Sequence, residues 1–158
     1  EAVRLQNLLE DGPVVLVFYR GAWCPYCSLQ LSTYKAMQPE LDDYDAALVA
    51  VSPQRPDKSL SQREKQNLDY QILSDTGNTI ARQYTTVFQL AERPKNTMNE
   101  LGMDFESHYA DESGELPVPA VFVIGTDGTV LLADSKGGDF HKRTEPEEIL
   151  RALKAKQS

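Results

Sequence analysis

The sequence has little cysteine, few basic residues and no long apolar run, and each shortage excludes a class of protein. Two cysteines in 158 residues are too few for the disulfide framework of a small secreted domain. The 24 acidic residues outnumber the 16 basic ones, and the net charge of −8 argues against a surface for nucleic acid or anionic membranes. The longest apolar run is strand-length, whereas a transmembrane helix needs roughly 20 residues. We therefore expect no nucleic-acid or membrane partner and a cytoplasmic location, although the lack of an initiator methionine leaves room for a segment before Glu1.

The two cysteines, Cys24 and Cys27, are three positions apart and closely follow the apolar run of residues 14–19. A CxxC pair is typical of redox chemistry or of half a metal site. A structural zinc site needs four ligands, but there is no second CxxC, and His108 and His141 are isolated far downstream. A pair of inert buried thiols is the other alternative, because free cysteine is often buried as a small hydrophobe. The position directly after a strand favours a reactive dithiol, without a metal.

Hydrophobic periodicity predicts an α/β fold whose sheet begins with parallel strands. Buried strands are indicated at residues 14–19 and 46–51, with a helix between them that begins at Pro25 and has one apolar stripe. A strand, a helix and a strand in this order fit a right-handed crossover between parallel strands. The other expected elements are an N-terminal helix, a restart of the second helix at Pro39, helices at 61–68 and 78–84 capped by Ser61 and Asn78, a strand at 70–73, a hairpin at 120–133 and a last helix after Thr144.

The regular pattern disappears between Val87 and Leu116. This stretch contains charges, single apolar residues, Pro94 and Gly102, with at most a short helix at residues 97–101. We interpret it as an insertion or lid before the C-terminal hairpin. Because the chain has no internal repeat, low-complexity tract or linker, we predict a single domain over residues 1–158.

The predicted start of the second helix explains the positions of both thiols. Pro25 suits the first helical position, so Cys24 caps the helix and Cys27 lies in its first turn. The partial positive charge and free N–H groups of a helix N-terminus stabilise a thiolate. We therefore predict that Cys24 is the nucleophile with a lowered pKa, and that Cys27 resolves the intermediate. Residues three apart on one turn lie about 5 to 6 Å apart, which suits a redox-active disulfide without any other cofactor.

Two aromatic residues flank the pair. Trp23 directly precedes Cys24 and is expected to cover one side of the site with apolar surface. Tyr26 lies between the cysteines at the junction of loop and helix, where an aromatic side chain either contacts substrate or simply packs.

The stretch F-Y-R-G-A-W-C-P-Y-C at residues 18–27 resembles the active site of the thioredoxin superfamily, and its Pro-Tyr dipeptide is the one found in glutaredoxins. S-P-Q at 52–54, L-S-D at 73–75 and P-A-V-F-V-I-G-T-D-G-T at 119–129 resemble the peroxiredoxin-like group of the alkyl hydroperoxide reductase and thiol-specific antioxidant family, AhpC/TSA. The likeness covers nearly the whole chain. It implies a thioredoxin-like fold and an antioxidant role in cell redox homeostasis.

The resemblance also has consequences for residues around the thiols. Pro119, preceded by Val118, would be the cis-proline that faces the CxxC pair and whose backbone pairs with a bound peptide or glutathione. Peroxiredoxins carry a Thr or Ser three residues before the reactive cysteine and an Arg beside it, but the matching positions here are Gly21 and Pro119. The usual peroxide-binding residues are therefore missing. Arg20 is the nearby cation that could replace the arginine, or it could point into solvent.

Three functional hypotheses follow. The first is a peroxiredoxin-like peroxidase restored by an external thiol reductant such as thioredoxin or glutathione. The second is a protein disulfide reductase of the thioredoxin or glutaredoxin type, using the same two thiols. The third is a non-catalytic binding module with a thioredoxin fold, in which residues 87–116 recognise a partner.

Overall fold

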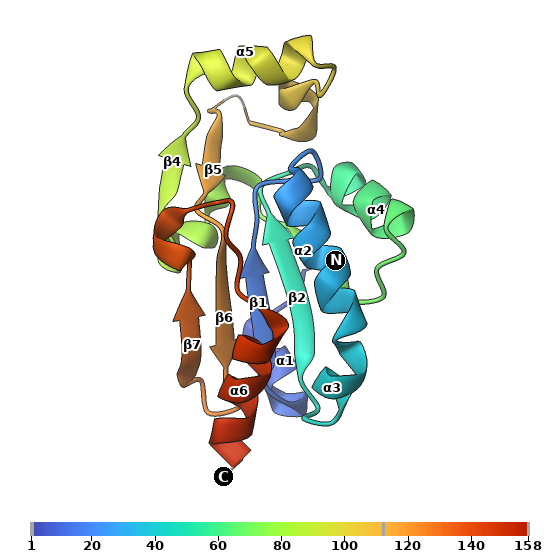
Figure 1. Ribbon diagram of the computed structural model, residues 1–158, viewed down its shortest axis with the longest axis vertical. Helices are drawn as coiled ribbons and strands as arrows, with labels where there is room; N and C mark the ends of the chain where they lie inside the picture. The colour runs from blue at the N-terminus through green and yellow to red at the C-terminus, as the bar shows by residue number, and fades with distance from the viewer. Residues whose placement is uncertain (1, 112, 158) are drawn as a thin grey trace.

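A five-stranded mixed sheet forms the centre of the fold, with helices on both faces (Figure 1). The computed structural model describes residues 2–111 and 113–157. The strand order is β3-β2-β1-β6-β7; the first three strands in the sequence are parallel, β6 is antiparallel to β1, and β7 is antiparallel to β6. The strands are Val14–Phe18 (β1), Ala47–Ser52 (β2), Gln71–Ser74 (β3), Ala120–Ile124 (β6) and Val130–Asp134 (β7). The predicted α/β class, the parallel start of the sheet and the terminal hairpin are confirmed.

The central strand β1 is buried on both faces, which explains its unbroken apolar sequence. Side chains alternate between the two faces of a strand. Val15 and Val17 belong to one core cluster, whereas Val14, Leu16 and Phe18 belong to the other. A strand covered on both sides has no solvent face to fill with polar residues.

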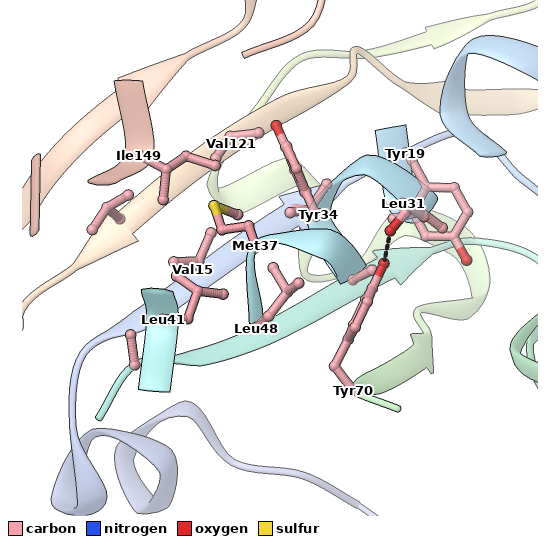
Figure 2. Close-up of a cluster of buried hydrophobic side chains, with 14 of the residues drawn as sticks. Val15, Tyr19, Leu31, Tyr34, Met37, Leu41, Leu48, Tyr70, Val121 and Ile149 are labelled. Atoms are coloured by element: carbon pink, nitrogen blue, oxygen red, sulfur yellow. Dashed lines mark hydrogen bonds between the residues drawn. The ribbon is translucent and has the colours of Figure 1, made fainter. Parts of the chain in front are cut away.

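Of the six helices in the part of the chain that the structure describes, four contribute side chains to these two clusters. The helices are Leu5–Asp11 (α1), Pro25–Ala36 (α2), Gln38–Asp42 (α3), Pro56–Lys65 (α4), Glu92–Glu100 (α5) and Pro146–Gln157 (α6). Side chains from α2, α3 and α6 pack on one face, and those of α1 pack on the other. Figure 2 shows the first cluster, in which Tyr70 Oη donates a hydrogen bond of 2.7 Å to Leu31 O on α2. Each large apolar side chain buried here contributes roughly 1.5–3 kcal/mol, so α2, which carries Cys27 and directly follows Cys24, is firmly attached to the sheet.

Residues 87–116 form a substructure beyond one end of the main sheet (Figure 1). Strands β4 (Val87–Gln89) and β5 (Glu115–Pro117) pair as a separate two-stranded sheet. The helix in this stretch, α5, begins five residues earlier than the predicted start of the short helix, at Glu92. Phe105, Tyr109 and Leu116 make a small core against which Trp23 packs. The insertion therefore contacts the segment that leads into the CxxC pair.

The predicted helix start at Ser61 is wrong. Helix α4 begins at Pro56, which occupies the first helical position after Arg55 in an extended conformation. Proline with its fixed φ starts a helix without losing an intrahelical hydrogen bond. Ser61 therefore lies in the second turn, and its spacing to Glu64 caps nothing.

The predicted helix capped by Asn78 is also wrong. Residues 76–78 and 81–83 form two separate 3₁₀ turns, and Asn78 has a left-handed backbone with φ 59°. Asp75 provides the acceptor instead, because its carboxylate accepts the N–H groups of Ile80 and Ala81. None of the helices in the described chain is both long and apolar enough to span a membrane.

Candidate active site

Cys24 lies at the junction between the sheet and α2. It is the N-cap residue of α2 with an extended backbone, Pro25 occupies the first helical position, and Cys24 Sγ accepts the backbone N–H of Cys27 at 3.3 Å. This is the arrangement predicted from the sequence. Both cysteines are free and fully buried. The positive end of the helix and a free N–H group therefore act on Cys24 Sγ.

Two arginines contact the sulfur atoms. Arg20 Nη2 donates to Cys24 Sγ at 3.2 Å. Arg143 Nη2 lies 3.4 Å from Cys27 Sγ and 3.7 Å from Cys24 Sγ. Arg20 is only 8% exposed, so it does not point into solvent. The described structure thus surrounds the thiols with two guanidinium groups, one of them adjacent in sequence and the other distant.

The surroundings of Cys24 lower its pKa to about 5. The largest cause is the hydrogen bond from the Cys27 side chain, which burial opposes. The charge of Arg20, its hydrogen bond and the backbone N–H of Cys27 lower the pKa further. Cys24 is therefore a thiolate at neutral pH.

Cys27 behaves in the opposite way. Burial raises its pKa well above the ordinary value, and its hydrogen bond to Cys24 and the negative charge on Cys24 raise it further. The charge of Arg143 lowers it. One thiolate and one neutral thiol therefore share the site, as two coupled ionisable groups at short distance require.

An aromatic enclosure covers Arg20. Its guanidinium carbon lies 4.3 Å from the centre of the Phe140 ring and 5.0 Å from that of Trp23. Tyr26, which is 41% exposed, packs edge-to-face on Phe140 and on His141. Cations above aromatic faces are held by the ring quadrupole. Trp23 therefore contacts Arg20 directly, whereas Tyr26 reaches it through Phe140.

The backbone before Cys24 is held by groups from two other segments. The N–H of Ala22 donates to Gln54 Oε1 at 3.0 Å, and Tyr109 Oη donates to Arg20 O at 2.8 Å. The indole N–H of Trp23 donates to Tyr109 Oη in turn. The insertion therefore fixes the loop that positions Arg20.

Gly21 is enclosed by the same contacts. A Cβ atom there would lie 2.7 Å from Trp23 Nε1 and 3.0 Å from Tyr109 Oη. Such distances leave no room for the Thr or Ser of the AhpC/TSA pattern. Trp23 folds back over the position that the hydroxyl side chain would occupy.

The predicted cis-proline is wrong. No peptide bond in residues 2–111 or 113–157 is cis, so the bond from Val118 to Pro119 is trans. The N–H of Val118 donates to Thr86 O, and Thr85 Oγ1 donates to Val118 O. The backbone of Val118 therefore pairs with the chain before β4, next to the two-stranded sheet. Pro119 is buried and, with Arg143, lines a small cavity beside the site.

Two hollows flank the first turns of α2. One, of about 540 Å³, lies on the side of Trp23 and His108. The other, of about 600 Å³, is lined by Tyr26, His141 and Arg143 among others. The second hollow reaches the guanidinium that contacts both sulfurs. Across the described segments, no three side chains of His, Cys, Asp or Glu are grouped to hold a metal ion.

Arg143 and Tyr109 had no signal in the sequence, whereas Gln54 belongs to the S-P-Q stretch that resembles the AhpC/TSA family. Arg143 is 116 residues from Cys27 and lies in the charged loop between β7 and α6. Tyr109 belongs to the stretch with no regular pattern. Only the packing of distant segments brings these groups to the thiols.

The lowered pKa of Cys24 predicts a thiolate titration at acidic pH. Reduced protein taken from pH 8 to lower pH should lose the thiolate absorbance near 240 nm with a midpoint near pH 5. Because only the thiolate attacks, reactivity with peroxide should fall over the same range. Cys24→Ser, measured as the control, should lack this step; a midpoint close to the ordinary thiol pKa in the unmodified protein would contradict the prediction.

The sequence matches the AhpC/TSA family over residues 1–133. A Mycobacterium tuberculosis protein provisionally named a peroxiredoxin is 36% identical over 81 residues, 51% of this chain and 53% of that protein. The chain thus spans about half the length of this curated relative. Peroxiredoxin Bcp of Bacillus subtilis is 26% identical over 117 residues, 73% of this chain and 71% of that protein.

Solved structures extend the likeness over the whole chain. The crystal structure of peroxidoxin BcpB from Mycobacterium tuberculosis has a TM-score of 0.75 and 28% identity, and the match covers 99% of this chain and 87% of that one. A Xanthomonas campestris bacterioferritin comigratory protein has a TM-score of 0.65 at 17% identity, covering 94% of this chain and 82% of that one. These matches confirm the predicted thioredoxin-like α/β fold.

Proposed function

Because the chain belongs to the AhpC/TSA family, we propose that it is a peroxiredoxin-like thiol peroxidase that reduces hydroperoxides through Cys24 and Cys27. The environment of Cys24 carries the proposal: its Sγ accepts hydrogen bonds from Arg20 and from the N–H of Cys27, and its pKa is lowered to about 5. A thiolate is the form of cysteine that attacks a peroxide. The peroxiredoxin names of several relatives support the same reaction.

In the first step, Cys24 Sγ attacks one oxygen of the hydroperoxide. An S–O bond forms and the O–O bond breaks, so that Cys24 becomes a sulfenic acid and the substrate leaves as an alcohol, or as water from hydrogen peroxide, after taking up a proton. Arg20 Nε is buried and has no hydrogen-bond partner among the described residues. It is a donor available to a peroxide oxygen as negative charge develops there.

In the second step, Cys27 attacks the sulfenic sulfur. An S–S bond forms and the hydroxyl group leaves as water after taking up the proton released by the Cys27 thiol. An external dithiol protein such as thioredoxin, or glutathione, then reduces the disulfide and is itself oxidised. We propose a cytoplasmic location on the ground that a reducing compartment supplies these thiols.

Burial of both sulfurs bears on the choice between a small and a large substrate. Cys24 and Cys27 are 0% exposed, so a protein disulfide has no direct access to either sulfur. A hydroperoxide is small enough to enter through the hollow beside Tyr26, His141 and Arg143. This burial supports peroxide reduction over the thioredoxin-like alternative.

We further propose that the whole chain acts as one unit, with residues 87–116 as part of the active site rather than a separate module. The support is the hydrogen bond from Tyr109 Oη to Arg20 O and the pairing of Gln54 with Tyr109. The first ties the insertion to the loop before Cys24, and the second ties it to Gln54, whose side chain accepts the N–H of Ala22 in that loop.

Stopped-flow fluorescence tests the function. Trp23 is the only tryptophan and directly precedes Cys24, so oxidation should change its emission. Reduced protein mixed with hydrogen peroxide or tert-butyl hydroperoxide should show a peroxide-dependent phase with a rate constant above about 10⁴ M⁻¹ s⁻¹. Insulin reduction in a parallel assay should not exceed that of dithiothreitol alone. No peroxide-dependent phase, together with rapid insulin reduction, would favour the disulfide reductase; silence in both assays would favour the binding module.

A further inference from the structure

The two arginines at the site are not equivalent in position. Arg20 comes from the loop after β1 and its closest sulfur is Cys24 Sγ at 3.2 Å. Arg143 comes from the loop between β7 and α6, and it lies nearer to Cys27 Sγ, at 3.4 Å, than to Cys24 Sγ, at 3.7 Å. The guanidinium group nearest to each sulfur is therefore a different one, and a hydrogen bond to a charged donor is among the stronger ones in proteins.

The second half of the cycle needs a negative charge on Cys27. A neutral thiol is a poor nucleophile, and burial holds Cys27 in its neutral form. While Cys24 is a thiolate, its charge and its hydrogen bond from Cys27 oppose ionisation of Cys27 as well. The neutral Cys27 thiol is then useful, because it is the main cause of the lowered pKa of Cys24.

Oxidation of Cys24 changes this balance. A sulfenic acid carries no full negative charge, so the repulsion on Cys27 and the demand for its proton both disappear. Burial still opposes the Cys27 thiolate. The positive charge of Arg143, in contact with Cys27 Sγ, offsets that cost.

Arg143 is held in place by groups that also belong to this site. Its Nη1 donates to Gln30 Oε1 at 3.2 Å, and its Nε donates to Phe140 O at 2.9 Å. Gln30 and Cys27 are one turn apart on α2, so the guanidinium is fixed to the same helix as the thiol that it contacts. The Phe140 ring packs over the guanidinium of Arg20, so one loop positions both cations.

From this geometry we propose that Arg143 is a catalytic residue of the resolving step: it stabilises the Cys27 thiolate that attacks the Cys24 sulfenic acid, whereas Arg20 serves the attack of Cys24 on the peroxide. The proposal rests on the proposed peroxidase function. In the resolving step the Cys27 S–H bond breaks, the S–S bond forms, the S–O bond of the sulfenic acid breaks, and the hydroxide leaves with the Cys27 proton as water. Arg143 exchanges no proton and no electron.

Arg143→Gln and its matched partner Arg20→Gln test the division of roles, because the first removes the charge nearest to Cys27 Sγ and the second removes the charge nearest to Cys24 Sγ. Stopped-flow fluorescence separates peroxide-dependent oxidation from peroxide-independent disulfide formation. Arg143→Gln should slow disulfide formation by about 10- to 100-fold, the usual effect of losing a charged hydrogen bond, with a smaller effect on oxidation. Arg20→Gln should do the reverse. Arg143→Lys should restore part of the rate of disulfide formation. In Arg143→Gln, the pH at which disulfide formation becomes rapid should rise.

A second measurement tests Arg143 without peroxide. Cys24 is first converted to a mixed disulfide with 5,5′-dithiobis(2-nitrobenzoate), which releases one coloured thiolate. Attack by Cys27 on Cys24 Sγ then releases the second, and this second release is measured. Arg143→Gln should slow this release by the same factor, while thermal denaturation checks that the variant is folded. Equal slowing by both arginine variants, or an unchanged release rate in Arg143→Gln, would overturn the proposal. A wild-type protein that releases the thiolate but does not react with peroxide would instead overturn the peroxidase function.

Discussion

Cys24→Ser is expected to abolish peroxide consumption, with a loss of several orders of magnitude relative to the unmodified protein. A serine hydroxyl is not ionised at neutral pH, whereas the pKa of Cys24 is lowered to about 5. Serine is also a favourable N-cap residue, and it can accept the N–H of Cys27 as the sulfur does. We therefore expect the loss of activity without unfolding. Residual peroxide measured by a ferrous-iron dye assay and thermal denaturation of the same samples provide the two readouts.

Cys24→Asp is the matched control for the charge at this position. A carboxylate keeps a negative partner for Arg20 and is a good N-cap residue, but it cannot form a sulfenic acid. The variant should be as inactive as Cys24→Ser and more stable than it, because Cys24→Ser leaves the buried guanidinium without a negative partner. Peroxide consumption by either variant at the wild-type rate would mean that another group reacts with the peroxide.

Local patterns in the sequence were sufficient to locate the thiols. The apolar run that forms β1, the change to helical periodicity and Pro25 at the first helical position all act within about two turns of the cysteines. Such short-range rules place an N-cap residue, because capping depends on neighbours in the chain. The capping pattern at Ser61 predicted the wrong helix start, because Pro56 begins α4 five residues earlier.

The electrostatics of the site could not be predicted in the same way. Arg143 and Tyr109 reach it only because the sheet order brings the loop after β7 and the insertion to the end of β1. The family pattern pointed to missing residues at Gly21 and Pro119. Arg20 was recognised as a candidate replacement for the arginine and does contact Cys24 Sγ, but no pattern indicated Arg143. The packing of Trp23 over Gly21 and the arrival of Arg143 from the loop before α6 are properties of the folded chain.

Cys27→Ser is expected to leave the first reaction with peroxide largely intact and to stop turnover. A serine hydroxyl can still donate to the Cys24 thiolate, which preserves the main cause of its lowered pKa. The sulfenic acid then has no neighbouring thiol. It must react with an external thiol at millimolar concentration, which is slower than the intramolecular attack by Cys27. Steady-state turnover with a dithiol reductant should fall about a hundredfold or more. Dimedone should trap the sulfenic acid, detected by mass spectrometry of the intact protein.

Cys27→Ala separates the two roles of this residue. It removes the resolving thiol as serine does, but it also removes the side-chain donor to Cys24 Sγ, so the pKa of Cys24 should rise and its thiolate fraction at a given acidic pH should fall. Both variants should therefore fail to form the disulfide, while only Cys27→Ala should also lose oxidation rate between about pH 5 and neutrality. Equal oxidation rates across that range would show that the Cys27 donor does not control the nucleophile. Turnover at the wild-type rate in either variant would show that the sulfenic acid is resolved directly by an external thiol.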